Sequence, residues 1–185
     1  MERSAGILLS VSSLPSPYGI GTLGKAAYEF ADFLAAAGQK YWQLLPLGPT
    51  SYGDSPYQSF STFAGNPYFI DLDMLIEDEL LTEEEVTMRD WGSNARAVDY
   101  GKIYENRFEV LAIAKVRGWE RDREEVAAFM EENKRWLGDY ALYMACKRHY
   151  GMCPWTEWPD DIRLRKAEAI AEAREALNAD VELFI

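Results

Sequence analysis

The chain has 185 residues, of which 48% are hydrophobic, 14% aromatic and 27% charged, a composition that excludes disordered, collagen-like and disulfide-rich classes. Its 19 basic and 31 acidic residues give a net charge of −12, which repels phosphate backbones and anionic lipid. We therefore expect no nucleic acid and no membrane as partners, and a neutral or cationic ligand fits better.

The first region, residues 1–72, begins with a predicted strand, helix and strand. The apolar run at residues 7–9 predicts a short strand, which the prolines of the next loop end. Apolar residues at helical spacing predict a helix over about residues 23–37, with Thr22 as its N-cap and Gly38 at its end. Residues 41–45 predict a second strand. This order indicates a right-handed parallel unit, and because both strands are apolar we expect helices to cover both faces or to ring a barrel.

A long loop over residues 48–67 follows the second strand and has neither helical nor strand periodicity. Such loops are uncommon in compact domains, and ligands bind at the carboxyl ends of parallel strands. Tyr52 and Tyr57 stand here among short polar residues, Asp54, Ser55 and Gln58. Flat rings beside such side chains suit a neutral, hydroxyl-rich ligand such as a sugar, although the loop's two phenylalanines can instead pack it down. Residues 68–72 then predict a short extended segment.

The second region, residues 73–138, is predicted to be an acidic helical insertion. Thr82 and Glu85 form a capping-box pattern, and further helices are predicted over about residues 104–117 and 123–136. The third region, residues 139–185, predicts a helix over about residues 139–150 and a charged helix over about residues 160–177. It ends in an apolar run where most domains place polar residues, so we expect a truncated chain.

Two other patterns have simple structural interpretations. The letters G-x-G-x-x-G occur over residues 19–24, but a loop separates them from the strand, and a tight turn before the helix is favoured over dinucleotide binding. Cys146, His149 and Cys153 match no structural zinc spacing, which favours a helix end with inward-packed thiols. We therefore expect no metal and no cofactor. Two cysteines and no recognisable leader favour the cytoplasm.

Long ordered motifs give the chain a specific resemblance. The motifs are Arg3-Ser4-Ala5-Gly6-Ile7-Leu8-Leu9, Ser13-Leu14-Pro15-Ser16-Pro17-Tyr18-Gly19-Ile20-Gly21, Trp42-Gln43-Leu44-Leu45-Pro46-Leu47-Gly48-Pro49, Gly53-Asp54-Ser55-Pro56-Tyr57-Gln58 and Gly65-Asn66-Pro67. Weaker echoes continue to Trp155-Thr156-Glu157-Trp158-Pro159. On these motifs the chain closely resembles the N-terminal part of the 4-alpha-glucanotransferase family, also called amylomaltases or disproportionating enzymes.

The resemblance implies a bacterial, cytoplasmic enzyme that moves a segment of an alpha-1,4-glucan to the 4-hydroxyl of another glucan or of glucose. The implied fold class is α/β, the N-terminal part of a TIM (β/α)₈ barrel with a helical insertion, with the barrel incomplete in this chain. It also implies that Tyr57 stacks on the sugar beside the cleaved bond, with Ser55 near it. Tyr52 and Tyr100 would hold a glucan at a secondary groove. No metal or organic cofactor is implied.

The motifs that would contain the catalytic carboxylates of this family are absent from the sequence. Retaining glycosyl transfer needs a nucleophile and an acid/base about 5 Å apart, and Asp54 is the only acid of the aromatic loop. One hypothesis is therefore a part of a glucanotransferase whose catalytic carboxylates lie outside this chain, with maltooligosaccharides as its ligands. The alternative is a stand-alone or remnant glucan-binding module without catalytic activity.

Overall fold

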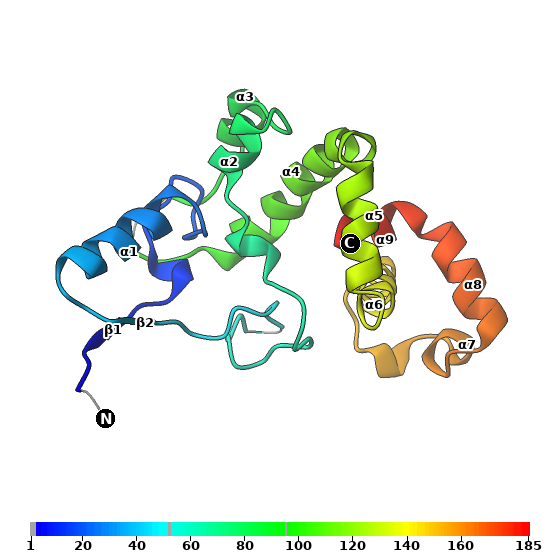
Figure 1. Cartoon of the computed structure of the whole chain (residues 1–185). Helices are drawn as coiled ribbons and strands as arrows, with labels where there is room; N and C mark the ends of the chain where they lie inside the picture. The colour runs from blue at the N-terminus through cyan, green and yellow to red at the C-terminus, as the bar shows by residue number, and fades with distance from the viewer. Residues whose placement is uncertain (1–2, 52, 95) are drawn as a thin grey trace. The chain divides into compact units, whose positions relative to one another are not determined.

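The structure is a computed structural model that describes residues 3–51, 53–94 and 96–185. It is mostly helical, with one small parallel sheet (Figure 1). The chain divides into two compact units, Met1–Ala114 and Lys115–Ile185, which are described separately below. The division of the sequence at residues 72 and 138 stays a prediction.

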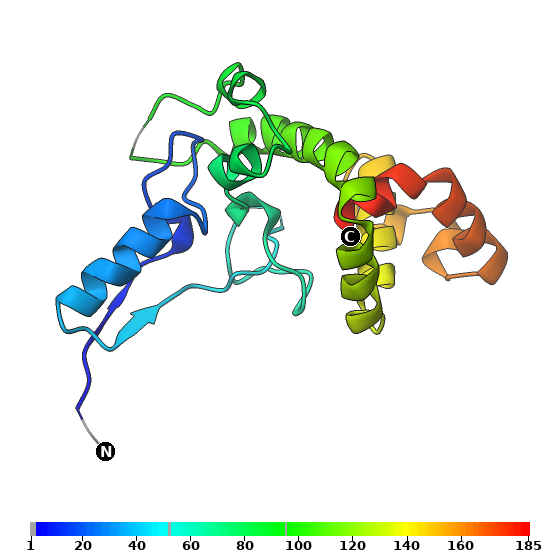
Figure 2. The same cartoon turned by 45° about the horizontal axis from the view of Figure 1, so that its top comes forward.

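The first unit contains the predicted strand–helix–strand unit. Strands β1 (Gly6–Leu8) and β2 (Tyr41–Gln43) pair in parallel, with Ile7 opposite Trp42. Helix α1 (Lys25–Ala36) connects them and lies beside the strands (Figure 2). Phe30 of α1 packs edge-on against Trp42, with 5.0 Å between ring centroids. The predicted strands, helix and parallel pairing are confirmed.

The sequence predicts helices that cover both faces of the sheet or ring a barrel, and among the described residues α1 is the helix beside the strands. Leu8 and Tyr41 are 56% and 64% exposed, although both are large and apolar in character. The ring of Trp42 packs under α1, and its indole N–H donates to the carbonyl of Leu9 at 2.8 Å. Helix α1 therefore covers the strands only in part, and these apolar side chains remain exposed.

The turn before α1 explains the glycines at residues 19–24. Gly19 has a φ of +75°, and a Cβ on Gly21 or Gly24 would collide with the Val11 carbonyl oxygen or the Asp71 carboxylate. These contacts confirm a tight turn. The predicted N-cap is wrong: the helix begins two residues later than expected, so Gly24 occupies the cap position and the Thr22 hydroxyl donates to Asp71. Gly38, at φ +70°, ends the helix as predicted.

The segment predicted as extended at residues 68–72 is instead a turn followed by a helix. A 3-10 helix (Pro67–Phe69) begins where the Asn66 side chain accepts the N–H of Tyr68 at 3.0 Å. Helix α2 (Leu72–Glu77) follows, and its N-cap Asp71 accepts the N–H of Met74 at 3.0 Å. Two side-chain caps therefore favour turn geometry over an extended chain.

Another 3-10 helix (Val11–Ser13) follows β1.

Helix α3 (Glu83–Thr87) begins with the predicted capping box. Its N-cap Thr82 accepts the N–H of Glu85 at 3.3 Å, and the Glu85 carboxylate accepts the N–H of Thr82 at 2.9 Å. Helix α4 (Tyr100–Arg121) follows and contributes to both units.

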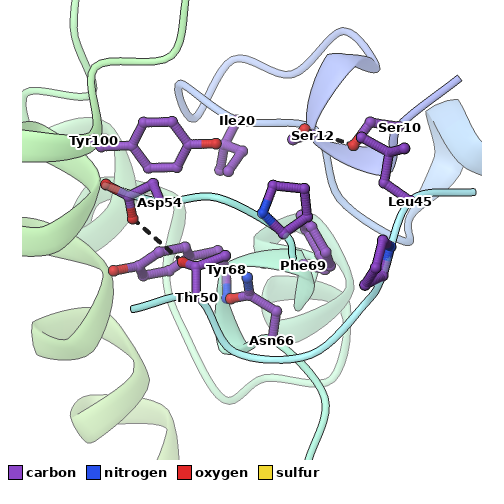
Figure 3. A pocket seen from close by; sticks show the side chains of 12 residues that line it. Ser10, Ser12, Ile20, Leu45, Thr50, Asp54, Asn66, Tyr68, Phe69 and Tyr100 are labelled. Carbon is purple, nitrogen blue, oxygen red and sulfur yellow. Dashed lines mark hydrogen bonds between the residues drawn. The ribbon is translucent and has the colours of Figure 1, made fainter. Parts of the chain in front are cut away.

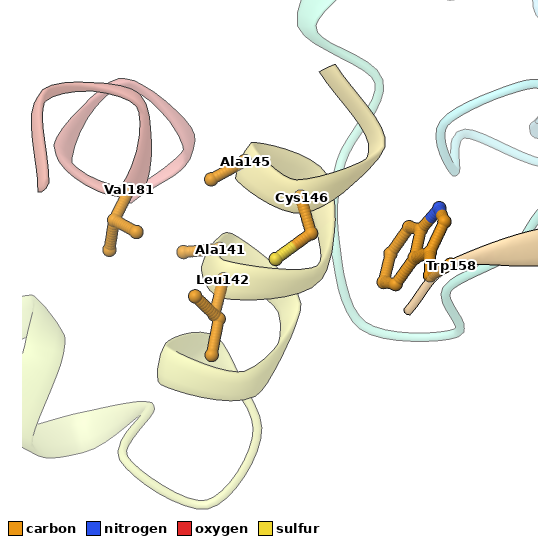
Figure 4. Packing of buried hydrophobic residues seen from close by; sticks show 6 residues of the cluster. All are labelled: Ala141, Leu142, Ala145, Cys146, Trp158 and Val181. Atoms are coloured by element: carbon orange, nitrogen blue, oxygen red, sulfur yellow. The ribbon is translucent and has the colours of Figure 1, made fainter. Parts of the chain in front are cut away.

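The second unit is helical. Its elements are α5 (Arg123–Glu132), α6 (Leu137–His149), a 3-10 helix (Trp155–Glu157), α7 (Asp160–Arg163), α8 (Ala167–Ala176) and α9 (Asn178–Phe184). Its core brings together small and apolar side chains of α6 with α9 and the segment before α7 (Figure 4): Ala141, Leu142, Ala145, Cys146, Trp158 and Val181. The single charged helix predicted over residues 160–177 is wrong. The backbone turns at Arg165, which has a φ of +56°, and this turn separates α7 from α8.

Candidate functional site

The candidate site is a pocket in the first unit, at the carboxyl ends of both parallel strands (Figure 3). Ser10 and Ser12 follow β1, Leu45 follows β2, and Tyr100 is the first residue of α4. The full lining consists of Ser10, Ser12, Ile20, Leu45, Pro46, Thr50, Asp54, Pro56, Asn66, Tyr68, Phe69 and Tyr100. This is the position at which open parallel sheets bind ligands.

The loop over residues 48–67 has the predicted irregular course among its described residues. Thr50 and Ser59 form an isolated antiparallel bridge that brings its two arms together. Between them the chain turns at Gly53 and Asp54, with φ values of +84° and +52°. The N–H of Asp54 donates to the carbonyl of Ser51 at 3.0 Å. The loop therefore holds the Asp54 side chain against the pocket.

Among the described residues that line the pocket, Asp54 is the one with an acidic side chain. It accepts a hydrogen bond from the hydroxyl of Thr50 at 3.2 Å (Figure 3). Burial raises the pKa of the Tyr68 phenol, and the charge of Asp54 raises it further. The same two causes, in the same order, raise the pKa of Tyr100. Both phenols therefore keep their protons at neutral pH and can donate as well as accept hydrogen bonds.

The structure brings some of the predicted site residues together and leaves others apart. Asp54 and Tyr100 both line the pocket. Ser55 and Tyr57 lie in the adjoining turn, where the Ser55 hydroxyl accepts the N–H of Tyr57 at 3.4 Å and the Tyr57 side chain is 73% exposed. Tyr52 lies outside the described residues. A role in binding stays a prediction for all five.

Sequence reasoning missed Ser10, Ser12, Asn66 and Tyr68 as pocket residues. The serines could have been found from their position directly after the first predicted strand. Asn66 and Tyr68 had no such signal, because the interpretation of residues 68–72 as extended hid the turn that places them in the wall.

The side chains that line the pocket carry aromatic rings, hydroxyl groups, an amide and a carboxylate. Among the described residues that line it there is no lysine or arginine. Hydroxyl, amide and carboxylate groups between tyrosine rings suit a neutral ligand with many hydroxyl groups. The described lining offers no cationic side chain that would favour a phosphate group. The enclosed volume is about 80 Å³, well below the roughly 300–1,000 Å³ of typical ligand pockets.

The Cys146, His149 and Cys153 pattern forms no metal-binding group in the structure. Within residues 3–51, 53–94 and 96–185, no three histidine, cysteine or acidic side chains are gathered as ligands. Cys146 is buried in the core of the second unit, and burial raises the pKa of its thiol. Across the same described residues, no helix combines the length and the apolar character that a membrane crossing requires.

The fold places a pocket at the carboxyl ends of the two parallel strands, and comparison with known proteins gives the family of the chain. Residues 9–185 match the profile of 4-alpha-glucanotransferases. The chain belongs to this family, which confirms the resemblance seen in its motifs.

Several 4-alpha-glucanotransferases are similar over nearly the whole chain. The 4-alpha-glucanotransferase of Clostridium butyricum is 51% identical over 176 residues, covering 95% of this chain and 36% of the relative. That of Thermus thermophilus is 48% identical over 185 residues, covering 98% of this chain and 36% of the relative. Amylomaltase from Streptococcus agalactiae, solved in complex with acarbose, superposes with a TM-score of 0.94 at 40% identity, covering 99% of this chain and 37% of that one. The chain spans about a third of the length of these relatives.

Proposed function

We propose that this chain is the part of a 4-alpha-glucanotransferase that supplies one wall of its glucan-binding site. The whole enzyme would move a segment of an alpha-1,4-glucan to the 4-hydroxyl of another glucan or of glucose. The observation that supports this most directly is the family match over residues 9–185 together with a pocket of tyrosines and short polar groups at the strand ends. The acarbose complex of the similar amylomaltase supports alpha-glucan binding.

The catalytic carboxylates of the proposed enzyme would lie outside these residues. A retaining double displacement uses one carboxylate as nucleophile and a second carboxyl group, about 5 Å away, as acid and base. Asp54 is the acidic residue among those that line the pocket. It is engaged by Thr50 and stands beside two phenols, which suits a carboxylate that accepts hydrogen bonds from sugar hydroxyls.

The proposed fold of the whole enzyme is a (β/α)₈ barrel, to which this chain contributes β1, α1 and β2. Active sites of such barrels lie at the carboxyl ends of their strands. The parallel pairing of β1 and β2, and the pocket at their carboxyl ends, support this assignment.

In the proposed complex the tyrosine rings pack against the C–H faces of glucose units while polar groups bind the hydroxyls. Tyr57 is free to stack because its side chain is exposed in the loop. Asp54, Asn66 and Tyr100 offer a carboxylate, an amide and a phenol from the wall. Ser55 supports the turn that presents Tyr57, and Tyr52 belongs to the proposal through the resemblance alone.

The cytoplasm is the proposed compartment. Cys146 and Cys153 are free thiols in the structure, as is usual for proteins of a reducing compartment. The net charge of −12 favours a neutral glucan over nucleic acid or an anionic membrane as partner.

The experiment that tests the proposal uses the purified chain with maltotriose and with maltoheptaose. We expect calorimetry to detect maltoheptaose binding, and chromatography to detect neither glucose release nor longer oligomers from maltotriose. Turnover would show that the catalytic carboxylates lie within these residues and make Asp54 the first target for mutation. Absence of binding by a folded chain would overturn the proposal.

The alternative function, a glucan-binding module without activity, is favoured by one observation: Asp54 has no second carboxylate beside it in the pocket lining. The two functions differ in a longer protein. Joining the chain to the remaining length of a relative, such as the Clostridium butyricum enzyme, should yield transfer activity if the chain is part of an enzyme. A folded chimera that binds maltoheptaose without transfer would favour the module.

A further inference from the structure

Arg107, on helix α4, is a buried cation that the proposed function does not use. Its side chain is 0% exposed. The guanidinium Nη2 donates to the carbonyl of Tyr68 at 2.8 Å and also to the carbonyl of Ile70. These two carbonyls flank Phe69, in the turn whose side chains form part of the pocket wall. One nitrogen of Arg107 therefore joins α4 to that turn.

The charge of Arg107 is retained although its surroundings oppose it. Burial lowers the pKa of the guanidinium to about 10, and the nearby Asp71 carboxylate acts in the opposite direction. Asp71 itself accepts hydrogen bonds from Thr22 and from the N–H of Met74. Within the described residues, Nε and Nη1 of Arg107 have no hydrogen-bond partner. A buried cation with unused donors is costly, so stability alone does not account for an arginine here.

Helix α4 connects this cation to another part of the pocket. Tyr100 begins the helix and lines the pocket, and Arg107 follows seven residues later, about two turns along the same helix. The helix thus presents one phenol directly and, through Arg107, holds the turn that presents the phenol of Tyr68. Asp54 acts on the pKa of both phenols, so the two rings lie close to a single carboxylate.

We infer that Arg107 is a positioning residue for glucan binding, which fixes the spacing between the phenols of Tyr100 and Tyr68. The inference rests on the proposed function. A sugar presents its hydroxyls at fixed distances, so a wall whose two phenols keep a constant spacing loses less entropy on binding. Arg107 contributes through Tyr68 and Ile70 and touches no ligand.

The test uses two variants of Arg107, Arg107→Met and Arg107→Lys. The control is Lys102→Met, which, like Arg107→Met, removes a positive charge from α4, but at an exposed ion pair with Asp90. Calorimetry gives the Kd for maltoheptaose, and amide hydrogen exchange reports on the turn. We expect R107M to weaken binding about tenfold and R107K about threefold, while K102M stays at the wild-type value. The Leu23 amide, which donates to the Phe69 carbonyl at 2.9 Å, should exchange faster in R107M. Amides of α6 should not change.

Each outcome decides at least one of the two proposals. Unchanged affinity of a folded R107M, beside a wild-type chain that binds, overturns the positioning role and leaves the proposed function intact. If the wild-type chain does not bind, the proposed function fails and the positioning role in glucan binding fails with it. Faster Leu23 exchange in R107M would then show only that Arg107 holds the turn. If R107M loses its helical circular dichroism, R107K decides, and wild-type affinity in R107K overturns the positioning role.

Discussion

At the scale of residues, two tyrosines at the candidate site differ in how deeply the fold buries them. Tyr68 is 8% exposed and belongs to the buried wall, whereas Tyr57 is 73% exposed at the turn beside Ser55. A residue that buries little surface contributes little to stability. Tyr57 can therefore be changed to test ligand binding without loss of the fold.

Tyr57→Ala is expected to weaken maltoheptaose binding about fivefold, since one ring stack contributes about 1 kcal/mol. The measurement is a calorimetric titration, and the midpoint of urea unfolding should stay at the wild-type value. Tyr28→Ala is the matched control, because Tyr28 is 65% exposed on α1. Equal affinity of Y57A and Y28A would remove Tyr57 from the proposed site.

The sequence allowed part of the pocket to be predicted. Asp54 and Tyr100 were both named as site residues, and both line it. Tyr68 and Arg107 were missed for a physical reason: each acts through a contact with a segment distant in the sequence. The carbonyls that Arg107 binds lie 37 and 39 residues before it, and periodicity does not reveal such contacts.

At the scale of elements, a local signal held where both partners lie within one turn of helix, and failed where a distant contact or an unusual backbone angle decides the structure. The Thr82 and Glu85 capping box was predicted because both partners lie within one turn of helix. The break between α7 and α8 was missed, because Arg165 adopts its positive φ within a charged, amphipathic sequence that has no glycine or proline at that point. The same limit applied to Thr22, whose partner Asp71 is far along the chain.

An ion pair between α4 and α9 gives the second unit an expected pH dependence. Lys115 donates to Glu182 at 2.7 Å, and this contact lowers the pKa of the Glu182 carboxyl below its ordinary value of 4.5. The pair therefore stabilises the unit fully above about pH 4.5, and its contribution is lost as the pH falls through the lower folded pKa.

Glu182→Gln should reduce the free energy of unfolding by up to about 1 kcal/mol at pH 7. The difference from wild type should shrink towards pH 3, because the Glu182 carboxyl takes up a proton and becomes as uncharged as the glutamine amide. Urea unfolding followed by circular dichroism at several pH values gives the comparison, with Glu168→Gln on the exposed part of α8 as control. A difference that is as large at pH 3 as at pH 7 would contradict the ion-pair explanation.

At the scale of the whole molecule, the described chain exposes apolar side chains on and beside its small sheet. Leu8 and Tyr41 belong to the two strands, and Phe33 of α1 is 63% exposed. The described sheet has two strands, so each strand also has an edge without a neighbour. Apolar surface next to open strand edges favours association between chains.

We therefore expect the isolated chain to bind a hydrophobic dye and to associate as its concentration rises. Leu8→Glu should reduce both effects, because it places a charge on the exposed strand. Met88→Glu is the control, since Met88 is 75% exposed at the end of α3, outside the two strands and α1. Sedimentation velocity over a range of concentrations gives the result, and a wild-type chain that remains monomeric throughout would contradict the prediction.

The small volume of the pocket has a consequence for the time a ligand stays bound. A wall that encloses about 80 Å³ contacts only part of a glucan. We therefore expect weak binding, for which a dissociation constant of about 1 mM, or about −4 kcal/mol, is a reference value. With association near 10⁶ M⁻¹s⁻¹, each encounter would last about a millisecond. Resonances of Tyr100 and Tyr68 would then move continuously during a titration with maltoheptaose, as in fast exchange.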